Sequence, residues 1–362
     1  MLQKYGKLII FAMMTTLLAL DSFKGCLSAR EAVEAAAAAL QGQETVRLPL
    51  SDGGEGFTDC IVSALGGHFR KVRVHDPLGR PLDASYGLVR SGGVAVIETA
   101  AAGGITLLKP SELDPWNASS YGIGEMMKDA VSQGVEEIWI GLGGTAVMDG
   151  GTGLLEALGP LPANLRIQAF FDADVPLTGP VGAAFVFGPQ KGADAGMVRK
   201  LDARFRQLAG QWKRQYGIGA DTVPGAGAAG GIGAALGVCL GAEMHSGISA
   251  VLQAAGFRNL LPASGLVITG EGKADRQTLA GKAPYGVLRA VKEVAPDLPV
   301  VLVAGLVEDR DALLAAGFDE VVQATPEQDL SGNYLDPSVA RENLRRAVRR
   351  VAQDFQQLGN EH

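Results

Sequence analysis

Short apolar runs alternate with longer amphipathic segments near both ends of the chain. The runs with the composition of buried strands lie at residues 16–20, 45–50, 266–269, 300–304 and 320–324. The segments after these runs have helical spacing, and the first begins with Ser28 and Glu31, the pattern of a capping box. Strands that alternate with helices in this way are typical of a parallel sheet covered by helices on both faces.

The middle of the chain follows a different pattern. Apolar and polar positions alternate over residues 68–97 around the turn residues Pro77, Gly79 and Pro81, which indicates antiparallel strands. The further elements expected in this region are helices at 119–132 and 197–216 and strands at 137–142 and 183–187. The middle region therefore has the pattern of a second α/β domain inserted into the first.

The order of these elements predicts a discontinuous architecture. We expect residues 1–67 and 262–362 to form a flavodoxin-like, doubly wound α/β domain with strand order 2-1-3-4-5, and residues 68–261 to form the inserted α/β domain. The strands at 16–20 and 266–269 then flank the point where the strand order reverses, and ligands bind outside the carboxyl ends of strands at such a point. The turns that follow them, DSFKG and GEGKADRQT, are among the most polar and Gly-rich pieces of the chain.

Composition narrows the class of protein. Hydrophobic residues make up 47% and charged residues 20% of the 362 residues, which excludes a disordered chain. The net charge of −7 and the absence of a basic run argue against nucleic acid as a partner. Four histidines without metal-ligand spacing and three cysteines without a CxxC pair favour reduced thiols in the cytoplasm over a zinc site or disulfides.

The N-terminus imitates a signal peptide, because two lysines precede an apolar run from Leu8 to Leu20. That run is too short to span a bilayer, and cleavage within it would remove the first predicted strand. We therefore expect no membrane partner, and we expect Met13 or Met14 to be the natural start. Whether the chain forms a homo-oligomer stays open at this point.

Glycine is the compositional outlier, because the chain contains 50 glycines and they gather in turns after the predicted strands. Four of these turns also carry polar or charged side chains, namely Lys24 in DSFKG, Asp52 and Glu55 in LSDGGEG, Thr145 and Asp149 in GLGGTAVMDGG, and Glu271, Asp275 and Lys282 in TGEGKADRQTLAGK. Phosphoryl transfer needs cations and backbone N–H groups to hold phosphates, carboxylates to hold Mg²⁺, and a carboxylate that accepts the proton of the acceptor hydroxyl. The four turns together contain this set of groups.

Two other nucleotide-binding patterns are not indicated. The P-loop pattern G-x-x-x-x-G-K-[ST] does not occur in the sequence. One G-x-G-x-x-G occurs at Gly225, Gly227 and Gly230, but it follows no apolar strand, so the context of a dinucleotide-binding fold is missing. A nicotinamide oxidoreductase therefore has little support.

Several motifs of the chain, taken in order, resemble those of bacterial glycerate kinases. They are DSFKGCLSAREA, PLSDGGEGF, HDPLGRPLDASYG, IETAAAGG, GLGGTAVMDGGTGLLEALG, VFGPQKGAD, GAGAAGGIGAAL and VITGEGKADRQTLAGKAPYGV. The resemblance covers roughly residues 14–325. It implies that ATP phosphorylates glycerate with the help of Mg²⁺, usually at the 2-hydroxyl, and that a flavodoxin-like domain carries an inserted α/β domain.

The resemblance supports many of these charged residues, and we assign roles as hypotheses. The catalytic candidates are Lys24, Asp52, Asp149 and Lys282. One of the two aspartates accepts the hydroxyl proton, and the lysines bind phosphate or the glycerate carboxylate. The Mg²⁺ candidates are Glu271 and Asp275. The candidates for binding substrate or phosphate are Ser22, Gly53, Gly54, Glu55, Arg80, Gly143, Gly144, Thr145, Gln190, Lys191 and Gln277.

One turn departs from the pattern of the resembling family. The loop commonly written GGSATNDGG is GGTAVMDGG here, so that Val147 and Met148 replace a hydroxyl and an amide side chain. Two alternatives therefore stay open, a kinase of another small hydroxy acid and a non-catalytic small-acid sensor on the same scaffold. The intact carboxylates of the charged turns favour a kinase.

Overall fold

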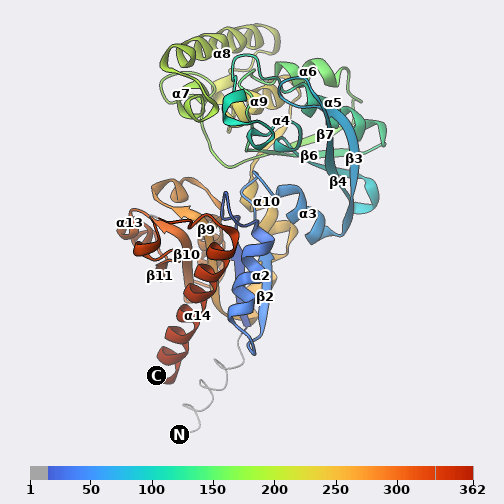
Figure 1. Ribbon diagram of the computed structural model, residues 1–362. Helices are drawn as coiled ribbons and strands as arrows, with labels where there is room; N and C mark the ends of the chain where they lie inside the picture. Colours follow the sequence, from blue (N-terminus) through green and yellow to red (C-terminus); the bar gives the residue numbers. More distant parts are fainter. Residues whose placement is uncertain (1–14, 331, 362) are drawn as a thin grey trace. The chain divides into compact units, whose positions relative to one another are not determined.

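The computed structural model describes residues 15–330 and 332–361, and the expected start methionine lies outside them. Two compact units are distinguished in the described part of the chain (Figure 1). The first unit contains the chain up to Ser51 and again from Val251, and the second unit is Asp52–Ala250. No helix within the described ranges is long and apolar enough to cross a membrane.

The first unit is built on a parallel sheet. Among the described residues its strands are β1 (Thr15–Leu20), β2 (Thr45–Pro49), β9 (Ser264–Ala274), β10 (Val300–Val307) and β11 (Glu320–Gln323). The order across the sheet is β11-β10-β9-β1-β2, and every neighbouring pair is parallel. Counted along the chain this order is 2-1-3-4-5, which confirms the predicted strand order and places β1 and β9 at the reversal.

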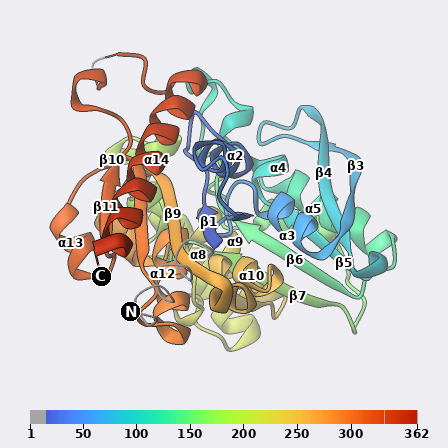
Figure 2. The ribbon, with the colours of Figure 1, turned by 90° about the horizontal axis from the view of Figure 1, so that it is seen from below.

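Helices cover the faces of this sheet. The helices of the unit are α2 (Ala29–Ala39), α11 (Phe257–Leu260), α12 (Ala283–Val294), α13 (Arg310–Ala315) and α14 (Pro337–Glu361), and α10 (Gly247–Ala254) spans its boundary. Helices α2 and α14 lie side by side over one face, where Ala36 and Leu344 join Leu20 and Ile268 in one apolar cluster (Figure 2). The capping box predicted for Ser28 is present and begins α2.

The second unit is built on a mixed sheet. Among the described residues its strands are β3 (Gly67–His75), β4 (Pro81–Val89), β5 (Val94–Glu98), β6 (Glu137–Leu142), β7 (Arg166–Phe171) and β8 (Glu243–Ser246). They lie in chain order, with antiparallel pairing from β3 to β5 and parallel pairing from β5 to β8. The carboxyl ends of β5, β6 and β7 therefore lie at the same edge of the sheet.

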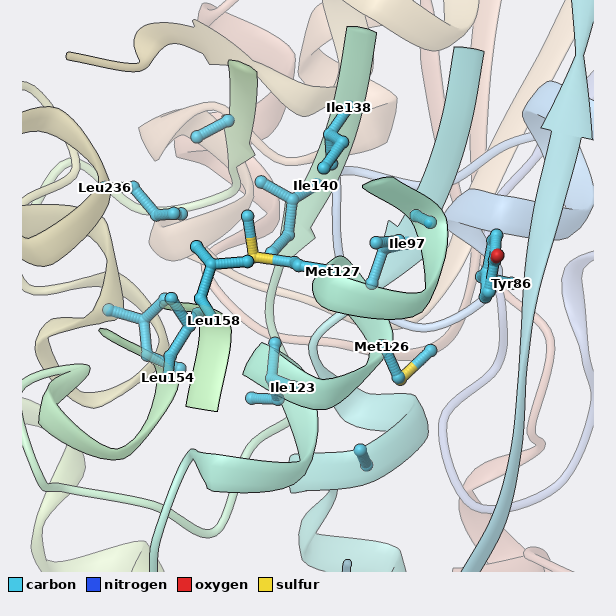
Figure 3. Packing of buried hydrophobic residues seen from close by; sticks show 14 of the residues in the cluster. Tyr86, Ile97, Ile123, Met126, Met127, Ile138, Ile140, Leu154, Leu158 and Leu236 are labelled. Atoms are coloured by element: carbon cyan, nitrogen blue, oxygen red, sulfur yellow. The ribbon is translucent and has the colours of Figure 1, made fainter. Parts of the chain in front are cut away.

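Helices pack against this sheet to form a second core. They are α3 (Phe57–Leu65), α4 (Ala100–Gly103), α5 (Tyr121–Ser132), α6 (Thr152–Leu158), α7 (Ala183–Phe187), α8 (Ala195–Tyr216) and α9 (Ala228–Ala234). Figure 3 shows Met126 and Met127 of α5 packed among Ile97 and Ile140 of the sheet. All four side chains are fully buried, so this cluster fixes the sheet edge from which the polar loops emerge.

Four features differ from the expected organisation. The units divide after Ser51 and Ala250, whereas we expected boundaries after residues 67 and 261. Helix α3 lies in the second unit, where the Phe57 ring packs 5.2 Å from the ring of Phe170. The apolar run 183–187 is the short helix α7 instead of a strand, because five apolar residues in a row fit a short helix as well as a strand. Strands β7 and β8 were not expected.

Candidate functional site

In the first unit, two polar turns meet at the carboxyl ends of β1 and β9. The N–H of Asp21 donates to the carbonyl of Gly270 at 2.9 Å. A Cβ atom at Gly272 would lie 3.0 Å from the backbone nitrogen of Lys24, so the turns touch through their backbones. The sequence predicted this juxtaposition, because both turns follow the strands that flank the reversal. Ser22 is buried here, and Lys24 is exposed.

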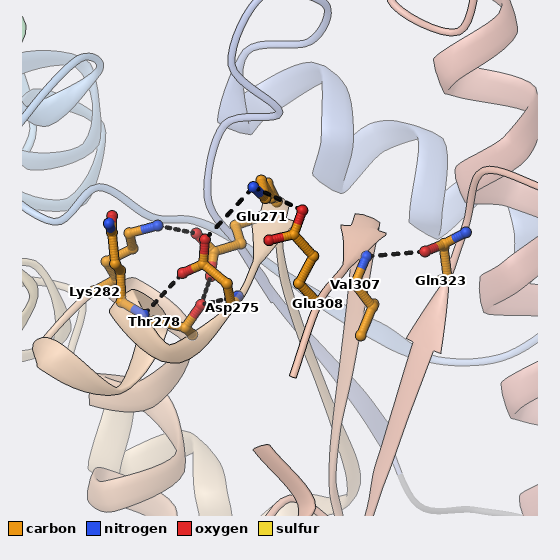
Figure 4. Close-up of polar contacts among 9 residues, drawn as sticks. Glu271, Asp275, Thr278, Lys282, Val307, Glu308 and Gln323 are labelled. Carbon is orange, nitrogen blue, oxygen red and sulfur yellow. Dashed lines mark hydrogen bonds and ion pairs between the residues drawn. The ribbon is translucent and has the colours of Figure 1, made fainter. Parts of the chain in front are cut away.

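Glu271 is a buried carboxylate of this cluster, with a relative exposure of 6%. Its Oε1 accepts a hydrogen bond from the Thr278 hydroxyl at 2.6 Å, and Lys282 Nζ lies 3.2 Å from its Oε2 (Figure 4). A buried carboxylate must be paired or hydrogen-bonded, and both conditions are met. The predicted residues Glu271 and Lys282 are therefore brought together. Thr278 was not predicted, although it stands within the quoted motif.

Asp275 begins the short 3₁₀ helix η8 (Arg276–Ala280). Its Oδ1 accepts from the backbone N–H of Gln277 at 2.8 Å, and Lys273 Nζ lies 3.8 Å from its Oδ2. Gln277 enters this network through its backbone, and its side chain is exposed. No group of three or more His, Cys, Asp or Glu side chains that would hold a metal occurs within the described residues. Mg²⁺ needs only one or two protein carboxylates beside water and phosphate oxygens. The two carboxylates of Glu271 and Asp275 therefore fit an open Mg²⁺ site better than a closed site made of protein ligands alone.

In the second unit, the loop at residues 52–56 packs against the end of β6 through glycine backbones. A Cβ atom at Gly143 would lie 2.6 Å from the Cα of Gly54, and one at Gly141 would lie 2.6 Å from the Gly53 carbonyl oxygen. Gly53 also has a φ of +104°, a conformation that other residues rarely adopt. These positions therefore require glycine. Asp52 in the same loop is buried, and its Oδ1 lies 3.3 Å from the Gly54 nitrogen that donates to it.

Two side chains from other elements hold the turn at residues 143–151. The Thr99 hydroxyl donates to the Gly141 carbonyl at 2.9 Å and accepts from the Gly143 N–H at 3.2 Å. Lys191, in the 3₁₀ helix η4 (Pro189–Lys191), donates from Nζ to the Thr145 hydroxyl at 3.2 Å and to the Val147 carbonyl at 2.9 Å. Lys191 and Thr145, both predicted site residues, are thus in direct contact.

Lys191 is almost completely buried, with a relative exposure of 3%. Desolvation lowers the pKa of its ammonium group to about 7, and the nearby charges of Asp149 and Asp172 only partly oppose this effect. A lysine in this environment changes its charge close to neutral pH. The neighbouring Gln190 is exposed.

Asp149 is buried and accepts four hydrogen bonds from its surroundings. The donors are the N–H and hydroxyl of Ser120 at 2.9 and 2.8 Å and the N–H groups of Gly151 and Gly153 at 2.9 and 3.1 Å. The carboxylate therefore joins the starts of α5 and α6. Asp149 also lines a cavity of about 800 Å³, whose wall includes Ser119, Arg204 and other residues of this unit.

Arg80 forms ion pairs with two carboxylates of its own unit. Its Nε lies 2.6 Å from Asp76 Oδ2, and its Nη1 lies 2.7 Å from Glu112 Oε1. Both contacts are ion pairs with carboxylates, which raise the pKa of the guanidinium further. In the structure Arg80 thus forms ion pairs with protein carboxylates. Its contact with substrate stays a prediction.

One half-buried acid of this edge was not assigned from the sequence. Glu98 ends β5, and its Oε1 accepts from the backbone N–H of Thr58 at 2.7 Å. Burial raises the pKa of its carboxyl group to about 7, and the charges of Asp59 and Glu55 add to this effect. The signal was present, because Glu98 stands directly after an apolar run in the motif IETAAAGG.

The chain from residue 16 to residue 356 matches the glycerate kinase family, in the segments 16–163 and 160–356. A glycerate kinase from Halalkalibacterium halodurans is 37% identical over 352 residues, which cover 87% of this chain and 91% of that protein. The glycerate 2-kinase of Escherichia coli strain K12 is 35% identical, over 94% of this chain and 97% of that protein. Among solved structures, a protein assigned as glycerate kinase 2 from Salmonella typhimurium LT2 is similar, with a TM-score of 0.77 and 35% identity over 96% of this chain and 100% of that chain.

Proposed function

The chain belongs to the glycerate kinase family, and we propose that it transfers the γ-phosphoryl group of ATP to the 2-hydroxyl of D-glycerate, giving 2-phosphoglycerate and ADP. The observation that carries the choice of hydroxyl is the similarity to the glycerate 2-kinase of Escherichia coli over almost the full length of both chains. The polar glycine turns at the carboxyl strand ends of each unit supply the groups that phosphoryl transfer requires.

Within the first unit, we propose that Lys24 and Lys282 bind phosphate or the glycerate carboxylate. Asp275 and Glu271 would hold Mg²⁺, which when bound supplies positive charge beside the phosphates. Lys282 Nζ already lies 3.2 Å from Glu271 Oε2, whereas Lys273 Nζ lies 3.8 Å from Asp275 Oδ2. Asp275 is therefore the stronger candidate for direct contact with the metal ion.

Within the second unit, we propose that Asp52 accepts the proton of the glycerate hydroxyl. Asp149 is less suited to this step, because its carboxylate oxygens already accept four hydrogen bonds that join α5 to α6. Asp52 instead stands in a glycine loop whose backbone packs against the turn at Gly143. Gly53, Gly54, Gly143 and Gly144 would let substrate approach the backbone N–H groups closely.

We also propose that the first unit is a flavodoxin-like, doubly wound domain into which the second α/β domain is inserted. Its support is the strand order with helices packed against the sheet. A cytoplasmic location is part of the same proposal. It is favoured because all three cysteines lie in the described part of the chain and none forms a disulfide.

The test is turnover by the purified protein with ATP, Mg²⁺ and D-glycerate, with the product identified by ³¹P NMR. The proposal expects 2-phosphoglycerate together with ADP. Formation of 3-phosphoglycerate would contradict the choice of hydroxyl and leave the kinase activity intact. Turnover only with L-glycerate or another small hydroxy acid would contradict the choice of acceptor. No turnover by folded protein with any of these acids would support a non-catalytic role on this scaffold.

A further inference from the structure

Helix α3 lacks a capping side chain of its own. Its N-cap is Gly56, which has a left-handed conformation with a φ of 85° and no side chain to accept from the first turn. The N–H groups at a helix start have no partners within the helix and must find acceptors elsewhere. The Phe57 N–H donates to the Gly54 carbonyl at 3.2 Å.

Glu98 supplies the missing acceptor from another part of the chain. Its carboxylate accepts from the Thr58 N–H at 2.7 Å and also from the N–H of Gly56. The donors stand 40 and 42 positions before Glu98, so an acid at the end of β5 caps a helix that begins far earlier in the chain. A carboxylate at this place also interacts favourably with the positive end of the helix.

The capped segment is the loop that carries two of the candidate site residues. Asp52 and Glu55 precede α3 directly, and the loop between them packs backbone to backbone against β6 and the turn after it. Thr99, the residue after Glu98, holds the Gly141 carbonyl and the Gly143 N–H through its hydroxyl. Two adjacent residues at the end of β5 therefore hold the two glycine loops of this sheet edge.

We propose that Glu98 is a positioning residue: its carboxylate caps α3 in place of an N-cap side chain and thereby holds Asp52 and Glu55 in their reactive arrangement. This inference rests on the role proposed above for Asp52. Glu98 itself acts through the backbone of the Asp52 loop. The acids that face it are Glu55 in the loop and Asp59 in the first turn of α3.

Two substitutions at this position separate capping from proton transfer. Glu98→Gln keeps a carbonyl oxygen that accepts from Thr58, whereas Glu98→Ala removes the acceptor. We expect kcat to stay within a few-fold of the wild type in Glu98→Gln and to fall ~2- to 30-fold in Glu98→Ala, the range set by the loss of a helix cap. Asp59→Asn, which removes an exposed charge from the same helix, is the matched control and should leave kcat unchanged.

Hydrogen exchange of the peptide that covers residues 51–62 gives a readout without catalysis. We expect faster exchange of this peptide in Glu98→Ala, and protection near the wild-type level in Glu98→Gln and Asp59→Asn. Normal protection in Glu98→Ala would overturn the proposal. Loss of protection with unchanged kcat would overturn it as well, because the loop would not need the cap for catalysis.

The kinetics also distinguish the positioning role from proton transfer by Glu98 itself. If Glu98→Gln were as inactive as Glu98→Ala, with a loss of more than ~10²-fold, Glu98 would itself transfer a proton, and the positioning role would be wrong. Activity of Asp52→Asn is measured beside these variants. Full activity of Asp52→Asn would show that Asp52 is not the proton acceptor. Hydrogen exchange would still report whether Glu98 caps α3, so a failure of the Asp52 role is distinguished from a failure of the capping role.

Discussion

The buried ammonium group of Lys191 donates to the Thr145 hydroxyl at 3.2 Å, within the turn that follows β6. The same nitrogen donates to the Val147 carbonyl at 2.9 Å. Val147 stands at the position where the turn departs from the motif of the resembling family, and this contact uses its backbone. The departure therefore leaves the anchor of the turn intact, although both Val147 and Met148 are fully buried side chains.

The stability of the protein should depend on pH through Lys191. Its pKa is about 7 in the folded protein and 10.5 for the ordinary side chain, so the unfolded chain binds more protons between these values. The free energy of unfolding of the wild type should therefore rise with pH from 7 to about 10.5, relative to Lys191→Met. Urea unfolding of both proteins at a series of pH values measures this difference. A difference that does not change with pH would show that the buried ammonium keeps its charge.

Glu98 should produce a pH dependence in a different range. Its pKa is about 7 in the folded protein, above the ordinary 4.5, so the folded chain binds more protons between these values. The stability of the wild type relative to Glu98→Gln should therefore be greatest below pH 4.5 and fall as pH rises to 7. Unfolding measured from pH 4 to 8 tests this, and a rise over that range would contradict it.

Asp52 and Asp149 should respond differently to the same change. Asp52→Asn keeps an oxygen for the Gly54 N–H and should lower kcat by ~10²- to 10⁴-fold with little loss of stability, because a general base is removed. Asp149→Asn places an amide group among N–H donors and should destabilise the protein by roughly 1–3 kcal/mol. Steady-state kinetics and urea unfolding of both variants test this. A stable Asp149→Asn protein with a greatly reduced kcat would reverse the assignment.

Gly143 should not tolerate a side chain. A Cβ atom there would lie 2.6 Å from the Cα of Gly54, so the two loops would have to separate. Gly143→Ala should destabilise the protein by ~1–3 kcal/mol and lower kcat, because the backbone cannot relax as a side-chain tip does. Gly210→Ala in α8 is the control, since its nearest atom is the tip of Arg214 at 3.6 Å. Equal effects of the two substitutions on the unfolding midpoint would be evidence against this close approach.

Asp275 should matter for the metal ion. If it contacts Mg²⁺, Asp275→Asn should raise the Mg²⁺ concentration needed for half-maximal activity by ~10-fold or more. Asp297→Asn, an exposed acid in the same unit, is the control. Binding of Mn²⁺ with ADP, followed by electron paramagnetic resonance, gives a second readout. Unchanged Mn²⁺ binding in Asp275→Asn would exclude this residue as a ligand.

Local signals in the sequence were sufficient for much of the fold. The apolar runs predicted the five strands of the first sheet, and Ser28 with Glu31 predicted the start of α2, because strand burial and helix capping depend on residues close together in the chain. The strand order also predicted that the turns after β1 and β9 meet. The strand predicted for segment 183–187 was wrong, because a short apolar run does not distinguish a helix from a strand.

The sequence by itself determined which residues carry charge beside glycine, and these form the groups of the candidate site. Only the tertiary structure decided what each charge does. Asp149 became the acceptor for donors from α5 and α6, and Lys191 became the buried anchor of a turn more than 40 positions away. Glu98 became the cap of α3. Such contacts join residues far apart in the chain, and their strength depends on burial, so no local pattern of residues reveals them.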